Sequence, residues 1–245
     1  MKFKPMIKTP IFILIALGIW LGGQSLPADS PLTPVIPLKP LKINGSVAVS
    51  VRPYDTILSL FVRVRLDGKL VSGLRVTLMD RPAVEESAGL YSCRINGFTP
   101  VPGRTVSVAF DKKPGIPSIH APLSRSLLTA QATIGQLIKI TAPLPDAHVP
   151  LTPAGMLNVA WAGGNPPYSI EILPFTGADT TGDSVYSQTG VAGTSVSVPL
   201  AIFRPGAKFG IYIFSKMDDF RFSAKVDSNS QFLLRQSAAV YIFPE

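Results

Sequence analysis

Residues 57–74, ILSLFVRVRLDGKLVSGL, decide how this chain folds. Arg63 and Arg65 alternate with valines, so one side of the run is apolar and the other is charged. A period of two residues is typical of a β-strand with one buried face. The Asp67-Gly68 pair that follows is a hairpin turn signal, because both residues tolerate positive φ. We therefore expect a strand, a tight turn and a returning strand.

The same alternation recurs on both sides of this run. Turn signals about 8 to 12 residues apart are typical of an all-β sandwich. Gly135 and several β-branched residues argue against a helix at 124–137, the best remaining helix candidate. The expected strands are 47–51, 57–66, 74–78, 90–95, 105–110, 136–141, 157–161, 168–172, 195–198, 208–214, 220–226 and 238–243.

The composition agrees with many short strands. Only 16% of the 245 residues are charged, and 46% are hydrophobic. The 20 glycines and 24 prolines interrupt helices, and few charged residues are left to fill the solvent face of a long helix. The fraction of apolar residues excludes a disordered tail and a coiled coil.

The N-terminus has the pattern of a secretory signal peptide. Three lysines between residues 2 and 8 precede an uninterrupted apolar stretch at 11–23, and small residues follow it. We expect residues 1–25 to be removed by cleavage after Ser25, with Ala28 as the second choice. The alternative is an uncleaved anchor, but 13 apolar residues are fewer than the roughly 20 that span a bilayer. The expected location is secreted or periplasmic, with no stable membrane insertion after cleavage.

A Pro-rich leader is expected at residues 26–42. Its five prolines favour an extended polyproline conformation. Removal of residues 1–25 leaves 20 basic and 15 acidic residues, a net charge of +5. These basic residues are scattered along the sequence, with Lys112-Lys113 the only adjacent pair after the signal, so no nucleic-acid partner is expected.

Residues 43–135 are expected to form the first sandwich. The segment Ser87-Ala88-Gly89-Leu90-Tyr91-Ser92-Cys93 resembles the immunoglobulin pattern that has an acid, Gly, Tyr and Cys at every second position, with Ser87 in place of the acid. The resemblance implies that the Tyr91 hydroxyl bonds back to the backbone near the start of a strand. Cys93 is the only cysteine and has no partner. Together with residues 67–74, Asp-Gly-Lys-Leu-Val-Ser-Gly-Leu, and with Pro102-Gly103, the segment also resembles immunoglobulin-like modules of secreted bacterial proteins that have no disulfide.

Residues 136–245 are expected to form the second sandwich. Leu157, Val159 and Trp161 share one face of an early strand, which predicts that Trp161 lies in the core. The segment at 203–209, Phe-Arg-Pro-Gly-Ala-Lys-Phe, resembles the tyrosine corner of fibronectin type III domains, although Phe209 lacks the hydroxyl. Two consecutive immunoglobulin-like sandwiches are therefore the expected fold.

No group of residues forms a catalytic or metal-binding motif. His120, His148 and Cys93 have no zinc-ligand spacing. The acidic pairs Asp179/Asp183 and Asp218-Asp219 are the only candidates for calcium oxygens, and solvated turns explain them as well. We expect no catalytic residue, no metal, no cofactor and no enzyme activity.

Aromatic residues are concentrated at the C-terminal end, where nine of the 19 Phe and Tyr residues lie in the last 43 positions. If strands 208–214 and 238–243 are neighbours, alternation places four rings opposite the aliphatic face. These four, here called the aromatic strip, are Tyr212, Phe214, Tyr241 and Phe243.

Two roles are open for the aromatic strip: the first domain covers it, or it binds a partner. The chain is thus expected to be a structural or protein-binding module with an extracytoplasmic protein partner. The alternative is a carbohydrate-binding accessory module, in which exposed aromatics stack on a glycan.

The signal-peptide prediction is tested on exported protein. N-terminal sequencing should give a chain that begins just after Ser25. Recovery of the full-length chain from the membrane fraction would show instead that the segment is an uncleaved anchor.

Overall fold

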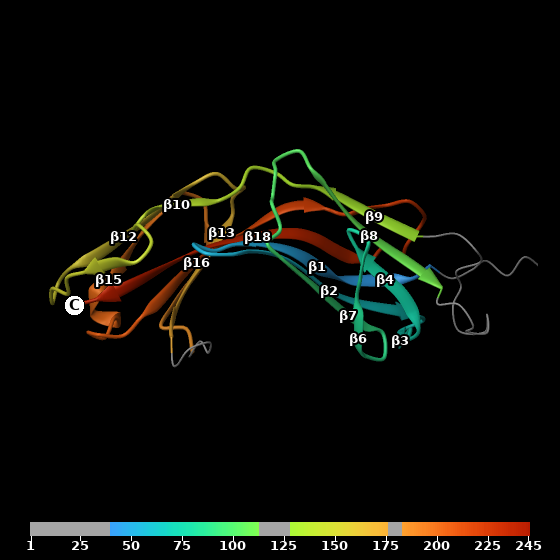
Figure 1. Ribbon diagram of the computed structural model, residues 1–245, viewed down its shortest axis with the longest axis horizontal. Helices are drawn as coiled ribbons and strands as arrows, with labels where there is room; N and C mark the ends of the chain where they lie inside the picture. The colour runs from blue at the N-terminus through green and yellow to red at the C-terminus, as the bar shows by residue number, and fades with distance from the viewer. Residues whose placement is uncertain (1–39, 113–127, 176–182) are drawn as a thin grey trace, which may run out of the picture. The chain divides into compact units, whose positions relative to one another are not determined.

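The computed structural model describes residues 40–112, 128–175 and 183–245, and Figure 1 shows its strands. The expected signal peptide, almost all of the Pro-rich leader, His120 and Asp179 lie outside these ranges. The described residues contain β-strands, one 3-10 turn, η2 (Leu200–Ile202), and no α-helix. None of them forms a helix long and apolar enough to span a membrane. The expected all-β fold class is confirmed.

One large sheet has the strand order β14-β13-β16-β18-β1-β2-β7-β6. Short strands β3 and β11 add to β2 and β18, respectively. The strands are β1 (Lys42–Val51), β2 (Thr56–Leu66), β3 (Lys69–Leu70), β6 (Val84–Ser87), β7 (Leu90–Asn96), β11 (Ala147–Val149), β13 (Tyr168–Pro174), β14 (Tyr186–Val191), β16 (Phe209–Asp219) and β18 (Gln231–Pro244).

Two smaller sheets pack against the large one. The five-stranded sheet has the order β17-β9-β8-β4-β5, and the three-stranded sheet has the order β10-β12-β15. Their strands are β4 (Leu74–Leu78), β5 (Arg81–Pro82), β8 (Thr105–Lys112), β9 (Leu128–Thr133), β10 (Lys139–Ala142), β12 (Met156–Ala162), β15 (Ser195–Pro199) and β17 (Arg221–Phe222).

Each smaller sheet shares a hydrophobic core with the large sheet. The first core joins large-sheet residues such as Val62 to five-stranded-sheet residues such as Phe110. The second joins large-sheet residues such as Ile170 to Trp161 of β12. Trp161 is only 3% exposed, which confirms its expected place in a core. The expected pair of sandwiches is therefore present, with one sheet common to both.

The C-terminal strand β18 contributes to both cores. Phe232 and Leu234 belong to the first core, whereas Val240 and Ile242 belong to the second. The sequence predicted only residues 238–243 as a strand, but alternation continues without Gly or Pro from residue 231. The limits 43–135 and 136–245 stay a prediction, and the packing adds part of the C-terminal segment to the first core.

The strand predicted at 220–226 is wrong beyond its first residues. Only Arg221–Phe222 pairs with another strand, β9, and Ala224 is exposed. The chain turns away where the Ser223 hydroxyl accepts a hydrogen bond from the Thr129 N–H at 3.0 Å. Phe220 instead stacks on Phe232 in the first core, with ring centroids 4.3 Å apart.

A buried glutamine lies where the two cores meet along β18. The Gln236 side chain, 2% exposed, accepts a hydrogen bond from the Ile138 N–H at 2.9 Å. Its amide donates to the Gln136 carbonyl and to the Ser215 hydroxyl, both at 3.0 Å. The strand expected at 136–141 therefore begins only at Lys139, because backbone groups before it bond to a side chain.

The turn predicted after the first long strand is confirmed. Asp67 and Gly68 have φ values of 51° and 76°, and β2 pairs antiparallel with β3 across them. Positive φ at both central residues is the requirement of a type I′ hairpin. The decisive run thus folds as its residues indicate.

Tyr91 makes the backbone contacts that the immunoglobulin resemblance implies. Its hydroxyl accepts a hydrogen bond from the Leu74 N–H at 3.0 Å and donates to the Val71 carbonyl at 3.1 Å. Leu74 begins β4, so this bond ties the large sheet to the five-stranded sheet. Burial raises the pKa of the Tyr91 phenol to about 12.

Replacing Tyr91→Phe should lower the free energy of unfolding by about 1–3 kcal/mol, because two buried backbone groups lose their partner. Urea denaturation monitored by Trp161 fluorescence measures this loss. The control is Tyr186→Phe, whose exposed hydroxyl donates to Gln188. An equal loss in both variants would contradict the role of the Tyr91 corner.

The stability that the Tyr91 hydroxyl contributes depends on pH. The folded state keeps the Tyr91 proton up to about pH 12, whereas the unfolded chain loses it near 10. The phenol's contribution is therefore complete below pH 10 and is lost as pH rises toward 12. The stability difference between wild type and Tyr91→Phe should narrow over that range.

Candidate functional site

The aromatic strip lies on the outer face of the large sheet. Strands β16 and β18 are antiparallel neighbours, which is the condition that the sequence prediction required. The alternate residues of these strands, including Ile211 and Val240, belong to the second core, and none of the four strip residues does. The inward and outward assignment made from alternation is therefore confirmed.

Small residues lie opposite the rings across the two strands. Tyr212 pairs with Ala239, and Tyr241 pairs with Gly210. A Cβ on Gly210 would lie 2.7 Å from Cε2 of Tyr212 and 3.1 Å from Cε2 of Phe175. Tyr212 and Tyr241 are thus diagonal neighbours, and Gly210 leaves the space that the rings of Tyr212 and Phe175 occupy.

The rings contact one another along the strip. Tyr212 and Phe214 have ring centroids 6.3 Å apart and planes within 15° of parallel. Tyr241 meets Phe175 edge to face at 5.1 Å. Tyr241 is 9% exposed, and the other three strip residues are half-buried. The strip therefore keeps part of its apolar surface accessible to a partner.

Lys208 holds one end of the strip. Its Nζ lies 4.4 Å from the ring centroid of Tyr241 and 5.4 Å from those of Phe175 and Phe243. An ammonium is attracted to the face of an aromatic ring, so one cation orders three rings together. At this end the His148 ring stacks on Phe243 at 5.6 Å.

The environment of the strip perturbs the Tyr212 phenol. Burial is the main cause that raises the pKa of Tyr212 above 10, and the neighbouring Tyr241 hydroxyl raises it further. Arg52 acts in the opposite direction. Tyr212 therefore stays protonated at physiological pH and can donate a hydrogen bond to a ligand.

A depression of about 480 Å³ adjoins the other end of the strip. Phe214 forms part of its wall, and polar or charged groups form much of the rest. Its lining includes Ser169, Glu171, Phe214, Lys216, Leu233 and Arg235. An aromatic ring beside groups of both charges can bind a ligand that has an apolar part and a polar part.

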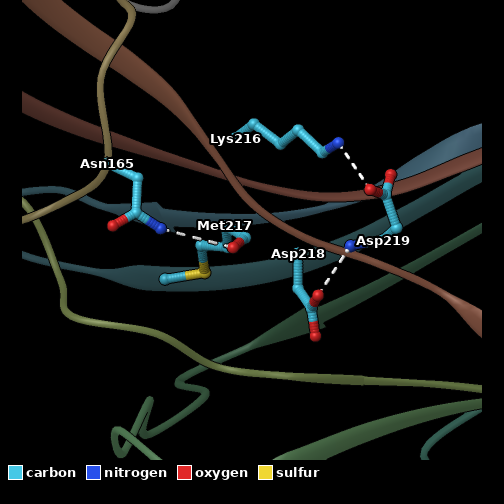
Figure 2. Close-up of polar contacts among 5 residues, drawn as sticks. All are labelled: Asn165, Lys216, Met217, Asp218 and Asp219. Atoms are coloured by element: carbon cyan, nitrogen blue, oxygen red, sulfur yellow. Dashed lines mark hydrogen bonds and ion pairs between the residues drawn. The ribbon is translucent and has the colours of Figure 1, made fainter.

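The acidic pair Asp218-Asp219 has a structural role at a bulge in β16. Figure 2 shows two of its contacts, from Asp218 to the Asp219 N–H and from Lys216 to Asp219. Asp218 accepts hydrogen bonds from the N–H groups of Thr133 and Asp219, at 3.1 and 2.8 Å. Asp219 pairs with Lys216 at 2.6 Å. Across the described ranges, no group of three or more His, Cys, Asp or Glu residues is placed to hold a metal.

Sequence reasoning missed several residues of this site. Phe175 precedes residues outside the described ranges, and the motif at 203–209 indicates only a corner position for Lys208. Glu171 and Arg235 are in alternating strands, so their outward direction was readable from the pattern. The sequence pattern could not show that Glu171 and Arg235 lie close together, because their proximity depends on the pairing of β13, β16 and β18.

No family model matches the chain, and neither does any curated protein. Among solved structures, the tandem immunoglobulin repeats of Dlar match at 14% identity and a TM-score of 0.31, over 82% of this chain and 99% of that one. A chimeric titin Z1Z2-Z1Z2 tandem matches at 15% and 0.26, over 84% and 100%.

Fibronectin(III)-like modules of Clostridium thermocellum CbhA match at 10% identity and a TM-score of 0.23, over 83% of this chain and 94% of that one. Immunoglobulin repeats and fibronectin type III-like modules are also the two classes that the sequence motifs resemble. At these scores the likenesses carry no argument about activity or partner.

The space at Gly210 can be tested directly. Gly210→Ala should push the Tyr212 ring toward solvent, because the new methyl group would overlap its edge. The pKa of the Tyr212 phenol should then fall toward 10, since burial is the main cause of its increase. NMR titration of the tyrosine ring signals measures this change, with Gly193→Ala, where a Cβ meets nothing within 4 Å, as the control. An unchanged Tyr212 pKa would contradict the packing described.

Proposed function

We propose that the chain is a non-enzymatic, extracytoplasmic module that binds a protein partner through the aromatic strip. The observation that supports this most is the position of the four rings, on the face of the large sheet opposite its own core. Rings needed only for folding would be expected inside a core. A binding face explains why apolar rings are placed outside it.

The chemistry of the strip suits a protein surface. Aromatic residues are enriched in protein interfaces, where they supply large apolar area with few rotatable bonds. Lys208 and Gly210 fix the rings before a partner arrives, which lowers the entropy lost on binding. The charged depression beside Phe214 supplies the polar rim that such interfaces have.

Carbohydrate binding is the second candidate function. The nearly parallel rings of Tyr212 and Phe214 are the observation that favours it, because sugar rings can stack on aromatic faces. The polar groups of Ser169 and Glu171 lie in the adjoining depression, where hydroxyl groups could bond to them. A glycan array screened with the exported protein distinguishes this function from protein binding.

The proposal is tested with the double variant Tyr212→Ser, Phe214→Ser. Both rings are half-buried, so unfolding should become easier by about 1–2 kcal/mol, and the protein should stay folded. Capture of a protein from an extracytoplasmic extract should be lost. The readouts are pull-down for capture and Trp161 fluorescence for folding.

The control variant is Leu144→Ser, Met156→Ser, which removes two exposed apolar side chains outside the strip. It should capture the partner as the wild type does. Capture that survives in the strip variant would show that the strip is not the binding face. A large loss of stability in that variant would show that the rings serve folding instead.

A further inference from the structure

A row of cations crosses the outer face of the large sheet beside the aromatic strip. Arg94 on β7 pairs with Ser59 on β2, and Ser59 pairs with Ala48 on β1. Ala48 pairs with Arg235 on β18, and Arg235 pairs with Lys216 on β16. Residues paired across neighbouring strands share a face. Cations therefore lie on both sides of two small residues.

An exposed aromatic residue lies in the next row of the same face. Phe61 on β2 is 53% exposed, and it pairs with Ser46 on β1 and Ser92 on β7. Arg63 follows it two residues later on the same face. We call Phe61, Arg63, Arg94 and Arg235 the arginine face. The depression that holds Phe214 also holds Arg235, so this face is continuous with the aromatic strip.

The positive charge of this face is not neutralised within the described residues. Arg63, Arg94 and Arg235 have no carboxylate partner there, and Arg94 donates only to the Asn96 side-chain oxygen at 2.9 Å. Lys216 is the exception, because it pairs with Asp219. The remaining charge is available to an anionic ligand.

Two like-charged pairs lie directly across neighbouring strands of this face. Lys42 faces Arg65, and Lys216 faces Arg235. Like charges directly opposite one another destabilise a sheet. The Nε of Arg65 is buried and has no hydrogen-bond partner among the described residues. Asp219 offsets the second repulsion by pairing with Lys216, whereas an acidic group bound beside Lys42 and Arg65 would reduce the first.

We propose that the arginine face docks an acidic segment of the protein partner, next to the surface that the aromatic strip binds. This inference rests on the proposed function. Guanidinium groups bind carboxylates through two parallel hydrogen bonds. By strand spacing, Arg94 and Arg235 are roughly 14 Å apart, the length of about four extended residues. The small residues between them leave room for such a segment.

The arrangement favours a protein segment over a long anionic polymer. Glu86 accepts a hydrogen bond from Ser92 at one margin of the face, and Glu171 lies at the other margin on β13. Both carboxylates would repel a polyanion that crosses the whole face. The combination of an exposed Phe with arginines is also typical of protein interfaces.

The test uses the exported protein and a fluorescent hexaglutamate peptide. The peptide should bind at low salt, and Arg63→Gln with Arg235→Gln should weaken it by about tenfold or more. The control is Arg75→Gln with Arg204→Gln, which removes the same charge from exposed positions elsewhere. The control should change binding less than about twofold, with Trp161 fluorescence unchanged in all variants.

Three results would overturn the proposal. One is no peptide binding by the wild type, and another is an equal loss in the control, which would mean a net-charge effect. The third is equally tight binding of polygalacturonate or a single-stranded oligonucleotide with the same dependence on Arg63 and Arg235. That result would identify a polymer in place of an acidic protein.

Partner capture separates this inference from the proposed function. If the strip variant loses capture and the arginine variant keeps it, the acidic-segment inference is wrong and the proposed function stands. If both variants keep capture, both proposals are wrong. Loss of capture in both variants supports both.

Discussion

The continuity of β18 is the constraint on which the rest of the structure depends. Its fourteen residues pair with β16 along one edge and with β1 and then β11 along the other. Inward side chains such as Leu234 and Ile242 enter different cores. A break in its alternation would turn the following side chains to the opposite face. One sheet could then no longer contribute residues to both cores.

The transition between the cores requires a polar residue at one inward position. Gln236 occupies the place on β18 where alternation calls for an apolar side chain. It is satisfied because Ile138, Gln136 and Ser215 provide one donor and two acceptors around it. The Gly163-Gly164 turn comes close to the same segment, since the Gly164 N–H bonds to the Gln136 carbonyl at 3.1 Å. The hydrogen bonds of this buried amide fix the path of the chain at residues 136–138, where the backbone has no strand partner among the described residues.

Local alternation was sufficient to predict most of the longer strands, the Asp67-Gly68 turn, the core position of Trp161 and the direction of each strip residue. These features depend on a few neighbouring residues. Local alternation missed β9 and β14, which are not among the expected strands. The errors at 136–138 and 220–226 have another origin, because there the backbone bonds to Gln236 and Ser223 from distant parts of the chain. Alternation cannot report such bonds. The length of β18 was underestimated because a polar residue, Gln236, interrupts its apolar face.

The arginine face also could not be predicted from local alternation. Its cations are scattered over the sequence, which argued against any basic patch, and only the strand register collects Arg63, Arg94 and Arg235 on one side of the sheet. Register is a property of pairing between strands, and a single sequence carries little information about it. The two cores of the described residues are built without these arginines and without the strip. Because these side chains lie outside both cores, the outer face of the sheet can change its chemistry while the inner face is kept.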